Sequence, residues 1–266
     1  MRRILTTMLL AAAIASTALC DDGDFQYQGQ LMPGQLLEIR GIFSPIHAQG
    51  SADSTVSITA HKTGHASDPA SVNIQVVPYD GGLVVCAVYP DADPNRPNTC
   101  NPPGMDNYTS VRDNDVQVEF TITVPLGVRL TARTLEGDMQ ATSLTADVDV
   151  STLRGAIMIS TSGGAQATTQ RGSITASIGK VAWTGLRFFD TGDGNLDLQI
   201  PADSNVSVRA SAFDGTVTSD FPLMTRSTSF GLFSLAYGTV GDGGRTLLLS
   251  TRDGNITLHK GPASGM

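Results

Sequence analysis

Apolar and polar residues alternate along most of this chain, and glycines interrupt the alternation at regular intervals. From Gly137 on, a Gly and usually a polar residue precede a short run in which every second residue is apolar, as in 194–200 (Gly-Asn-Leu-Asp-Leu-Gln-Ile). Further copies begin at Gly155, Gly172, Gly215 and Gly254. Successive copies up to Gly215 start roughly 17 to 22 residues apart, a period typical of stacked repeat architectures.

This pattern predicts strands with one apolar and one polar face. One such strand cannot bury its apolar face alone, whereas stacked copies bury a continuous column of side chains. A Gly before each strand allows a corner that a Cβ would hinder. We therefore expect an all-β fold, a β-solenoid that is a parallel β-helix. An antiparallel meander or sandwich is the alternative, because strands punctuated by glycine suit it too.

Strand patterns also fill the residues before the repeats. The clearest covers 115–124, where Val, Phe and Ile alternate with Gln, Glu and Thr. The expected organisation is a signal peptide at 1–20, a strand-rich N-terminal region at 21–125, the Gly-x-Ile repeat solenoid at 126–260 and a tail at 261–266.

The first twenty residues predict export. Two arginines after Met1 precede a dozen mostly apolar residues, 4–15, which are too few to span a bilayer. Two cleavage sites compete: 16–18 suits an ordinary signal peptidase, and 17–20 resembles a lipoprotein box ending in Cys20. Lipidation of Cys20 would tether the mature chain to a membrane, and cleavage before Leu19 would release it.

Composition agrees with an exported β protein and reduces the classes of partner that we expect. Glycine is abundant at 28 residues, only 16% of residues are charged, and the formal net charge is −8. A negative net charge opposes phosphate contacts, so neither nucleic acid nor an anionic lipid surface is an expected partner.

Cys86 and Cys100 bracket a loop rich in Pro, Asp and Asn. In an exported protein, two cysteines this close predict a disulfide, worth roughly 3 kcal/mol in the chain-entropy model. A free thiol pair or a metal site are the alternatives. Cys20 is then the unpaired cysteine, as expected if it lies outside the fold.

Candidate metal sites are weak. His61 and His65 are four residues apart, but a Gly lies between them at a strand end, so they share no helical face. The acidic, Gly-rich stretches 190–195 and 241–244 lack the spacing of an EF-hand loop, and their residues are the usual turn formers. We expect no metal and no cofactor.

Candidate catalytic groups are equally scattered. Ser177 and Lys180 match Ser-x-x-Lys, but the motif lies in the repeat array without a partner motif. Asp147 and Asp149 share one face of a strand, and Asp197 is another strand-borne acid. Trp183, Phe188 and Phe189 form an aromatic cluster that suits either carbohydrate stacking or a core plug.

The chain from Asp115 to Lys260 resembles a bacterial family of putative adhesins built from β-strand repeats, a domain of unknown function. The matching segments include 196–203 (Leu-Asp-Leu-Gln-Ile-Pro-Ala-Asp), 215–222 (Gly-Thr-Val-Thr-Ser-Asp-Phe-Pro) and 247–258. The resemblance implies an exported or envelope-exposed β-helical protein and no enzyme.

Two function classes follow. The first is a non-catalytic exported or cell-envelope protein, an adhesin or structural module, that binds a glycan or protein through its Thr- and Ser-rich faces. The second is a polysaccharide-acting β-helix lyase or glycosidase, which would need clustered acidic or basic groups on one face. The few, scattered acids favour the first.

Overall fold

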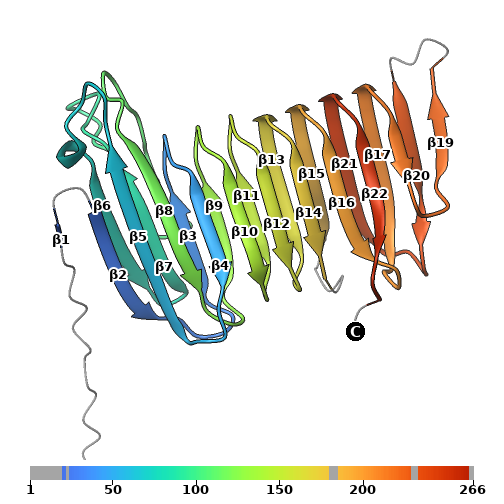
Figure 1. The fold of residues 1–266 in the computed structure, drawn as a ribbon, viewed down its shortest axis with the longest axis horizontal. Coiled ribbons are helices and arrows are strands. Elements are labelled where there is room, and N and C mark those ends of the chain that lie inside the picture. The colour runs from blue at the N-terminus through green and yellow to red at the C-terminus, as the bar shows by residue number, and fades with distance from the viewer. Residues whose placement is uncertain (1–19, 22–23, 180–184, 229–232, 264–266) are drawn as a thin grey trace, which may run out of the picture.

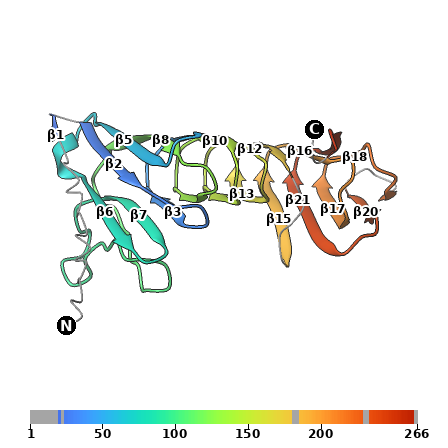
Figure 2. The same ribbon diagram turned by 90° about the horizontal axis from the view of Figure 1, so that it is seen from below.

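The computed structural model describes residues 20–21, 24–179, 185–228 and 233–263. More than half of them are in β-strands, and these strands form two long β-sheets that lie over one another as two layers (Figures 1 and 2). The described residues contain one short 3₁₀ helix, η1 (Pro69–Ser71). None of their helices is long and apolar enough to cross a membrane.

Each sheet has eleven strands. In spatial order, sheet A contains β1 (Cys20–Asp21), β2 (Asp24–Gln30), β5 (Thr55–Thr63), β8 (Gln117–Val124), β4 (Ile46–Gly50), β10 (Met139–Leu144), β12 (Ile157–Thr161), β14 (Ile174–Ile178), β16 (Leu196–Pro201), β22 (Ile256–Gly261) and β18 (Val217–Ser219). Sheet B contains β19 (Met224–Ser227), β20 (Ser234–Val240), β17 (Val206–Asp214), β21 (Arg245–Asp253), β15 (Leu186–Asp193), β13 (Ala165–Arg171), β11 (Val148–Ser151), β9 (Arg129–Arg133), β3 (Leu36–Arg40), β7 (Gly82–Val88) and β6 (Asn73–Tyr79).

The repeats form a solenoid in which each coil gives one strand to each sheet. The coils β9/β10, β11/β12, β13/β14 and β15/β16 follow one another in sequence and in space, and their strands pair in parallel. Equivalent residues stack: Ile157 pairs with Met139 on one side and with Ile174 on the other. The parallel stacking confirms the predicted solenoid and excludes an antiparallel sandwich for these coils.

The apolar residues that alternate along each strand point between the two sheets. Met139, Ile157, Ile174, Leu196 and Ile256 stack there and are each about 1% exposed or less. One continuous core therefore runs along the molecule, as expected when no coil can bury its apolar face alone.

At both ends a coil is inserted out of sequence order. Near the N-terminus, coil β3/β4 lies between β7/β8 and β9/β10. Near the C-terminus, coil β21/β22 lies between β15/β16 and β17/β18. Antiparallel strands then extend the sheets, with β5 and β6 at one end and β20 and β19 at the other. The chain thus returns into its own stack at each end.

The strands before residue 125 belong to the same two sheets as those after it. Strand β3 pairs in parallel with β9, and β4 pairs in parallel with β10. The expected boundary between a region at 21–125 and a solenoid at 126–260 therefore does not coincide with a break in the sheets. Before β4, Ser44 takes the position that Gly137, Gly155 and Gly172 occupy in later coils, because Phe43 bridges to Glu136 as Glu136 bridges to Arg154.

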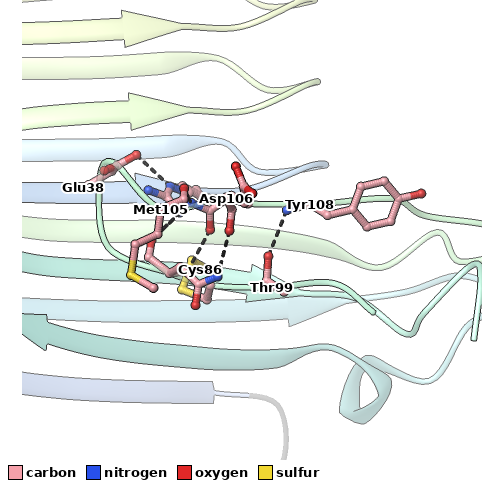
Figure 3. The surroundings of a disulfide bond; sticks show 10 residues. Glu38, Cys86, Thr99, Met105, Asp106 and Tyr108 are labelled. Carbon is pink, nitrogen blue, oxygen red and sulfur yellow. Dashed lines mark hydrogen bonds and ion pairs between the residues drawn. A yellow bond between two sulfur atoms is a disulfide. The ribbon is translucent and has the colours of Figure 1, made fainter. Parts of the chain in front are cut away.

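Residues 89–116 form a long loop over the outer face of sheet B at its N-terminal end. Cys86 and Cys100 are joined by a disulfide, with 5.9 Å between their Cα atoms. Figure 3 shows the segment with Met105 and Asp106 beside this disulfide and Glu38. The Arg40 guanidinium binds both Glu38 and the carbonyl of Asn101, which fixes the loop to β3.

Side-chain hydrogen bonds give this loop a defined shape. The Asn98 amide donates to the carbonyls of Tyr89 and Ser110 and accepts from the Ser110 N–H. The buried Tyr89 hydroxyl donates to the Val116 carbonyl at 2.7 Å, and burial raises the pKa of Tyr89 to about 12. Arg96 stacks 3.8 Å from the ring centroid of Tyr108.

One corner of most coils is built from glycine and threonine. The Gly172 φ is +148°, and a Cβ there would lie 2.0 Å from the Gly155 carbonyl oxygen of the coil before. The buried Thr169 hydroxyl donates to that same oxygen at 3.1 Å. In the next coils, Thr191 donates to Gly172 and Thr251 donates to Gly194. Successive coils therefore approach at this corner more closely than any side chain allows.

We expect Gly172→Ala to destabilise the protein by about 3 kcal/mol or more, because it combines an unfavourable φ with overlap against a backbone that cannot move alone. Gly34→Ala is the matched control: Gly34 also has a positive φ, +88°, but a Cβ there would meet nothing within 4 Å. Gly34→Ala should lower the free energy of unfolding by only about 1–2 kcal/mol. Chemical unfolding measures both. Equal losses would show that φ alone, and not coil contact, requires glycine.

Candidate binding groove

A groove of about 740 Å³ runs across the coils where the strands of sheet A end. Its walls come from the ends of β10, β12, β14, β16 and β22 and from the turns that follow them. Hydroxyl and amide side chains recur from coil to coil in the lining: Ser143, Thr145, Ser160, Thr161, Ser162, Ser177 and Gln199. Because neighbouring strands lie about 4.8 Å apart, these polar groups form a row with that repeat.

The groove also has an apolar floor. Leu144, Ile178 and Ile200 line it, and each is almost fully buried in the core beneath. Pro201 and Pro262 close its C-terminal end. A concave surface with an apolar floor and placed polar groups is the usual form of a ligand site.

A bulge in β10 forms the first wall. Ala141 pairs with Ile159 but Leu144 pairs with Thr161, so β10 carries an extra residue there. Ser143 has a φ of +55°, in the left-handed region that non-glycine residues seldom adopt. The coil before leaves room for it through Gly50, where a Cβ would lie 1.9 Å from the Ser143 carbonyl oxygen. Strained, bulged residues of this kind are common at functional sites.

Hydrogen bonds hold the lining in place. The Thr161 hydroxyl donates to the Ala146 carbonyl at 2.7 Å and accepts from the Gly163 N–H. The Ser177 hydroxyl donates to Gln199 Oε1 at 3.2 Å, linking two neighbouring coils. Among the described lining residues, Asp203 is the one charged side chain. The groove is therefore close to neutral although the protein is acidic.

The acids singled out in the sequence do not come together. Asp147 lies just before β11 and binds Arg187 at 2.6 Å, and Asp149 on β11 lies 3.8 Å from Arg133. Asp149 is therefore on sheet B, whereas Asp147 lies in the turn that leads into it and is not in a strand. Asp197 is on sheet A, 3.4 Å from His259. No pair of these carboxylates faces a shared ligand position, and none of them lines the groove.

The histidine pair is also separated. His61, on β5, contacts Asp24 on β2. His65 instead lines a smaller cavity of about 350 Å³, together with Asp115, Glu136 and Gly137. The described residues contain no group of three acidic, His or Cys side chains arranged to hold a metal ion.

The remaining candidates lie apart as well. Asp190 and Asp193 are on β15, and Asp193 pairs with Arg252. Ser177 lies in the groove, while Lys180 and Trp183 fall outside the described residues. Phe189 is buried in the core and Phe188 points to the outer face of sheet B, so these two rings form no common platform.

The groove itself was missed in the sequence, although a signal for it exists. Ser143, Ser160 and Ser177 are spaced 17 residues apart, which is the length of one coil. A polar residue that recurs at the coil period must form a row on the surface. The bulge in β10 that places Ser143 in this row has no repeated sequence pattern from which it could have been predicted.

The repeat signature and the two stacked sheets agree with a family comparison. The model of the family described as Toastrack DUF4097 matches residues 105–259, more than half of the chain. This protein belongs to the Toastrack family. The match begins in the disulfide loop and ends in β22, so it covers most coils of the Toastrack solenoid and the whole groove apart from its last residues.

Two solved structures were also found similar to this Toastrack protein. A putative cell adhesion protein from Clostridium sporogenes ATCC 15579 has 8% identity and a TM-score of 0.44, covering 89% of this chain and 99% of its own. A putative adhesin from Bacteroides fragilis NCTC 9343 has 12% identity and a TM-score of 0.37, covering 90% of this chain and 98% of its own. No curated protein matches the chain.

Asp115, beside the smaller cavity, allows a test against pH. The N–H groups of Ala66 and Ser67 donate to its carboxylate at 2.9 and 2.8 Å, and they lower its pKa to about 2. A carboxyl group whose pKa is lower in the folded protein than in the unfolded chain stabilises the fold at pH values above its pKa in the unfolded chain. This stabilisation is lost as the pH falls through the pKa that the group has in the folded protein.

We therefore expect Asp115→Asn to be less stable than the wild type at pH 7, with the difference shrinking between about pH 4 and pH 2. Urea unfolding at several pH values measures this. Asp242→Asn, at an exposed turn carboxylate, is the control. A difference that stays constant down to pH 2 would contradict the assignment.

Proposed function

We propose that this Toastrack protein is a non-catalytic binding module of the cell envelope or exterior, and that its groove binds an uncharged glycan chain. The observation that carries the proposal is the nearly neutral groove, with hydroxyl and amide groups at the coil repeat above an apolar floor. Sugars present both hydroxyl groups and C–H surfaces, and an extended chain of them matches a site that repeats along the coils.

The placement of the acids supports binding over catalysis. Most glycosidases use two carboxyl groups about 5–9.5 Å apart that flank the scissile bond. The described groove lining contains one acid, Asp203, whereas Asp149 lies on the other sheet and Asp147 in the turn that leads into it. A polysaccharide lyase or glycosidase therefore remains the weaker proposal.

Export is supported by the disulfide and by the N-terminal sequence. Disulfides such as Cys86–Cys100 persist in oxidising compartments and are rare in the cytosol. A basic start followed by a short apolar run precedes the first strand. The proposed locations are therefore periplasm, cell surface or exterior, with a lipid anchor if Cys20 is modified.

The groove is tested with Ser160→Arg, which places a long charged side chain in the middle of the lining. On a panel of neutral, acidic and amino glycans, we expect the wild type to bind neutral chains and Ser160→Arg to bind at least tenfold more weakly, a loss of about 1.4 kcal/mol. Thr175→Arg, on the neighbouring β14 but outside the lining, is the matched control. Equal glycan binding by all three proteins would exclude the groove as the binding site.

The same panel tests the enzymatic alternative. No reducing sugar or unsaturated product should appear, and changing Asp147, Asp149 and Asp197 together to Asn should leave glycan binding intact. If the wild type released such a product and the triple variant did not, the protein would be an enzyme and not a non-catalytic binding module.

Mass spectrometry of the mature N-terminus tests export. We expect a chain that begins at Leu19, or at a diacylglycerol-modified Cys20, because both sites follow the apolar segment. A protein that retains Met1–Ala18 after expression in a bacterial host with a Sec system would contradict export.

A further inference from the structure

One row of side chains runs along the whole outer face of sheet B and is apolar at both ends. Strand register places Val77, Val84 and Glu38 at the N-terminal end and then Thr131, Asp149 and Gln166 in the middle. The same row continues through Phe188, Leu248, Arg209, Tyr237 and Met224. A polar middle between two apolar ends is unusual for a face in water.

The two ends differ in what covers them. At the N-terminal end, Val84, Cys86 and Cys100 pack into a small cluster beneath the disulfide loop, and all three are buried. At the C-terminal end, Phe188 is 36% exposed and Met224 is 66% exposed. The same kind of surface is therefore buried by the loop at one end and open to solvent at the other.

The open end has the composition of a protein interface. We call the residues Phe188, Leu248, Arg209, Tyr237, Met224 and Arg226 the C-terminal patch. Aromatic residues, Met and Arg are the types enriched at interfaces, whereas acidic residues are depleted there. Arg226 lies 5.8 Å from the ring centroid of Tyr237. Asp190 is close to this patch, but it is on β15, whereas Arg226 is on β19 at the edge of the sheet.

Strand β19 adds an open edge to this patch. All four of its residues, Met224 to Ser227, are exposed, and it is the last strand of sheet B. At the opposite edge of the sheet, β6 contains Pro78, which lacks the N–H that a new strand would need. An exposed, unprotected edge strand invites contact with another chain.

Charge identifies the occupant. Residues 21–125 contain thirteen acidic and four basic side chains, whereas 126–266 contain twelve and eleven. The disulfide loop, 89–116, contains five acidic and two basic residues. At the tip of the turn that follows Cys100, here called the loop tip, Asp106 is exposed and Met105 is 59% exposed. An acidic loop with an exposed Met complements a patch of arginines and apolar side chains.

The positions of loop and patch on the sheet fit each other as well. Both lie on the outer face of sheet B, at opposite ends, and Figure 2 shows β7 at one end and β15, β17 and β20 at the other along the same side of the molecule. Cys86, which anchors the loop, pairs with Arg40, and register carries this row through Arg133, Ser151, Thr168, Asp190, Ser250, Ser211 and Leu235 to Arg226. The loop anchor and Arg226 are thus at the same height along the strands.

We infer that two copies of this chain form an antiparallel dimer through the outer faces of sheet B, with the disulfide loop of each copy on the C-terminal patch of the other. A two-fold axis along the strand direction, between the two faces, exchanges the ends of the solenoid and preserves height along the strands. Each loop then meets the partner's patch, so the contact occurs twice and the assembly closes at two copies. The groove on sheet A faces away from this contact.

A charge swap tests the dimer. Met224→Glu with Arg226→Glu makes the patch acidic, and Met105→Lys with Asp106→Lys makes the loop tip basic. By sedimentation velocity of the mature protein, we expect the wild type to be a dimer and each variant to self-associate at least tenfold more weakly. An equimolar mixture of the two variants should restore the dimer, because each then meets an opposite charge at both contacts.

Controls separate this result from misfolding and from other contacts. Both variants should keep the wild-type circular dichroism spectrum, and Met158→Lys, at an exposed Met of sheet A, should leave the dimer unchanged. A monomeric wild type, a mixture that stays monomeric, or growth beyond two copies would overturn the inference. A dimer that survives the loop variant but not the patch variant would also overturn it, because it would join two β19 edges.

Discussion

The contact on which the solenoid depends is the approach of one glycine to the backbone of the preceding coil. At this corner the carbonyl oxygen of Gly155 lies where a Cβ of Gly172 would have to be, and it accepts the buried Thr169 hydroxyl instead. The Thr satisfies a carbonyl that would be costly to leave unpaired in the interior. Glycine and threonine therefore act as one unit that sets the distance between coils, and the apolar column stacks in register because of it.

That unit is incomplete in the last coil of the stack. Thr precedes Gly by three residues in five coils, at 134, 152, 169, 191 and 251, but in coil β17/β18 Ala212 takes this place before Gly215. This coil is the last in space although not in sequence, because β21/β22 is inserted before it. Inserting a coil at each end ties distant parts of the chain together.

The sequence predicted the repeated part of this fold and much less of the rest. Alternation and spaced glycines are local signals, so the coils from β9 to β16 could be predicted from them. The insertion of β3/β4 and β21/β22 depends on which coil pairs best with which neighbour, and Ile256 carries the same local pattern in either order. The expected boundary at residue 125 rests on the same local signals, whereas β5, β6 and the long loop separate in sequence coils that are adjacent in space.

The groove and the disulfide loop lie where the regular array is interrupted. A regular coil offers only a flat ladder of polar side chains, and a ladder alone gives no depth. In the groove, the extra residue in β10 places Ser143 in a left-handed conformation over Gly50, at one end of the hydroxyl row. The disulfide loop is likewise an insertion between β7 and β8, and it alone covers an apolar end of sheet B. The coils thus supply a rigid repeat, and the interruptions supply shape, which is why residue types alone identified neither surface.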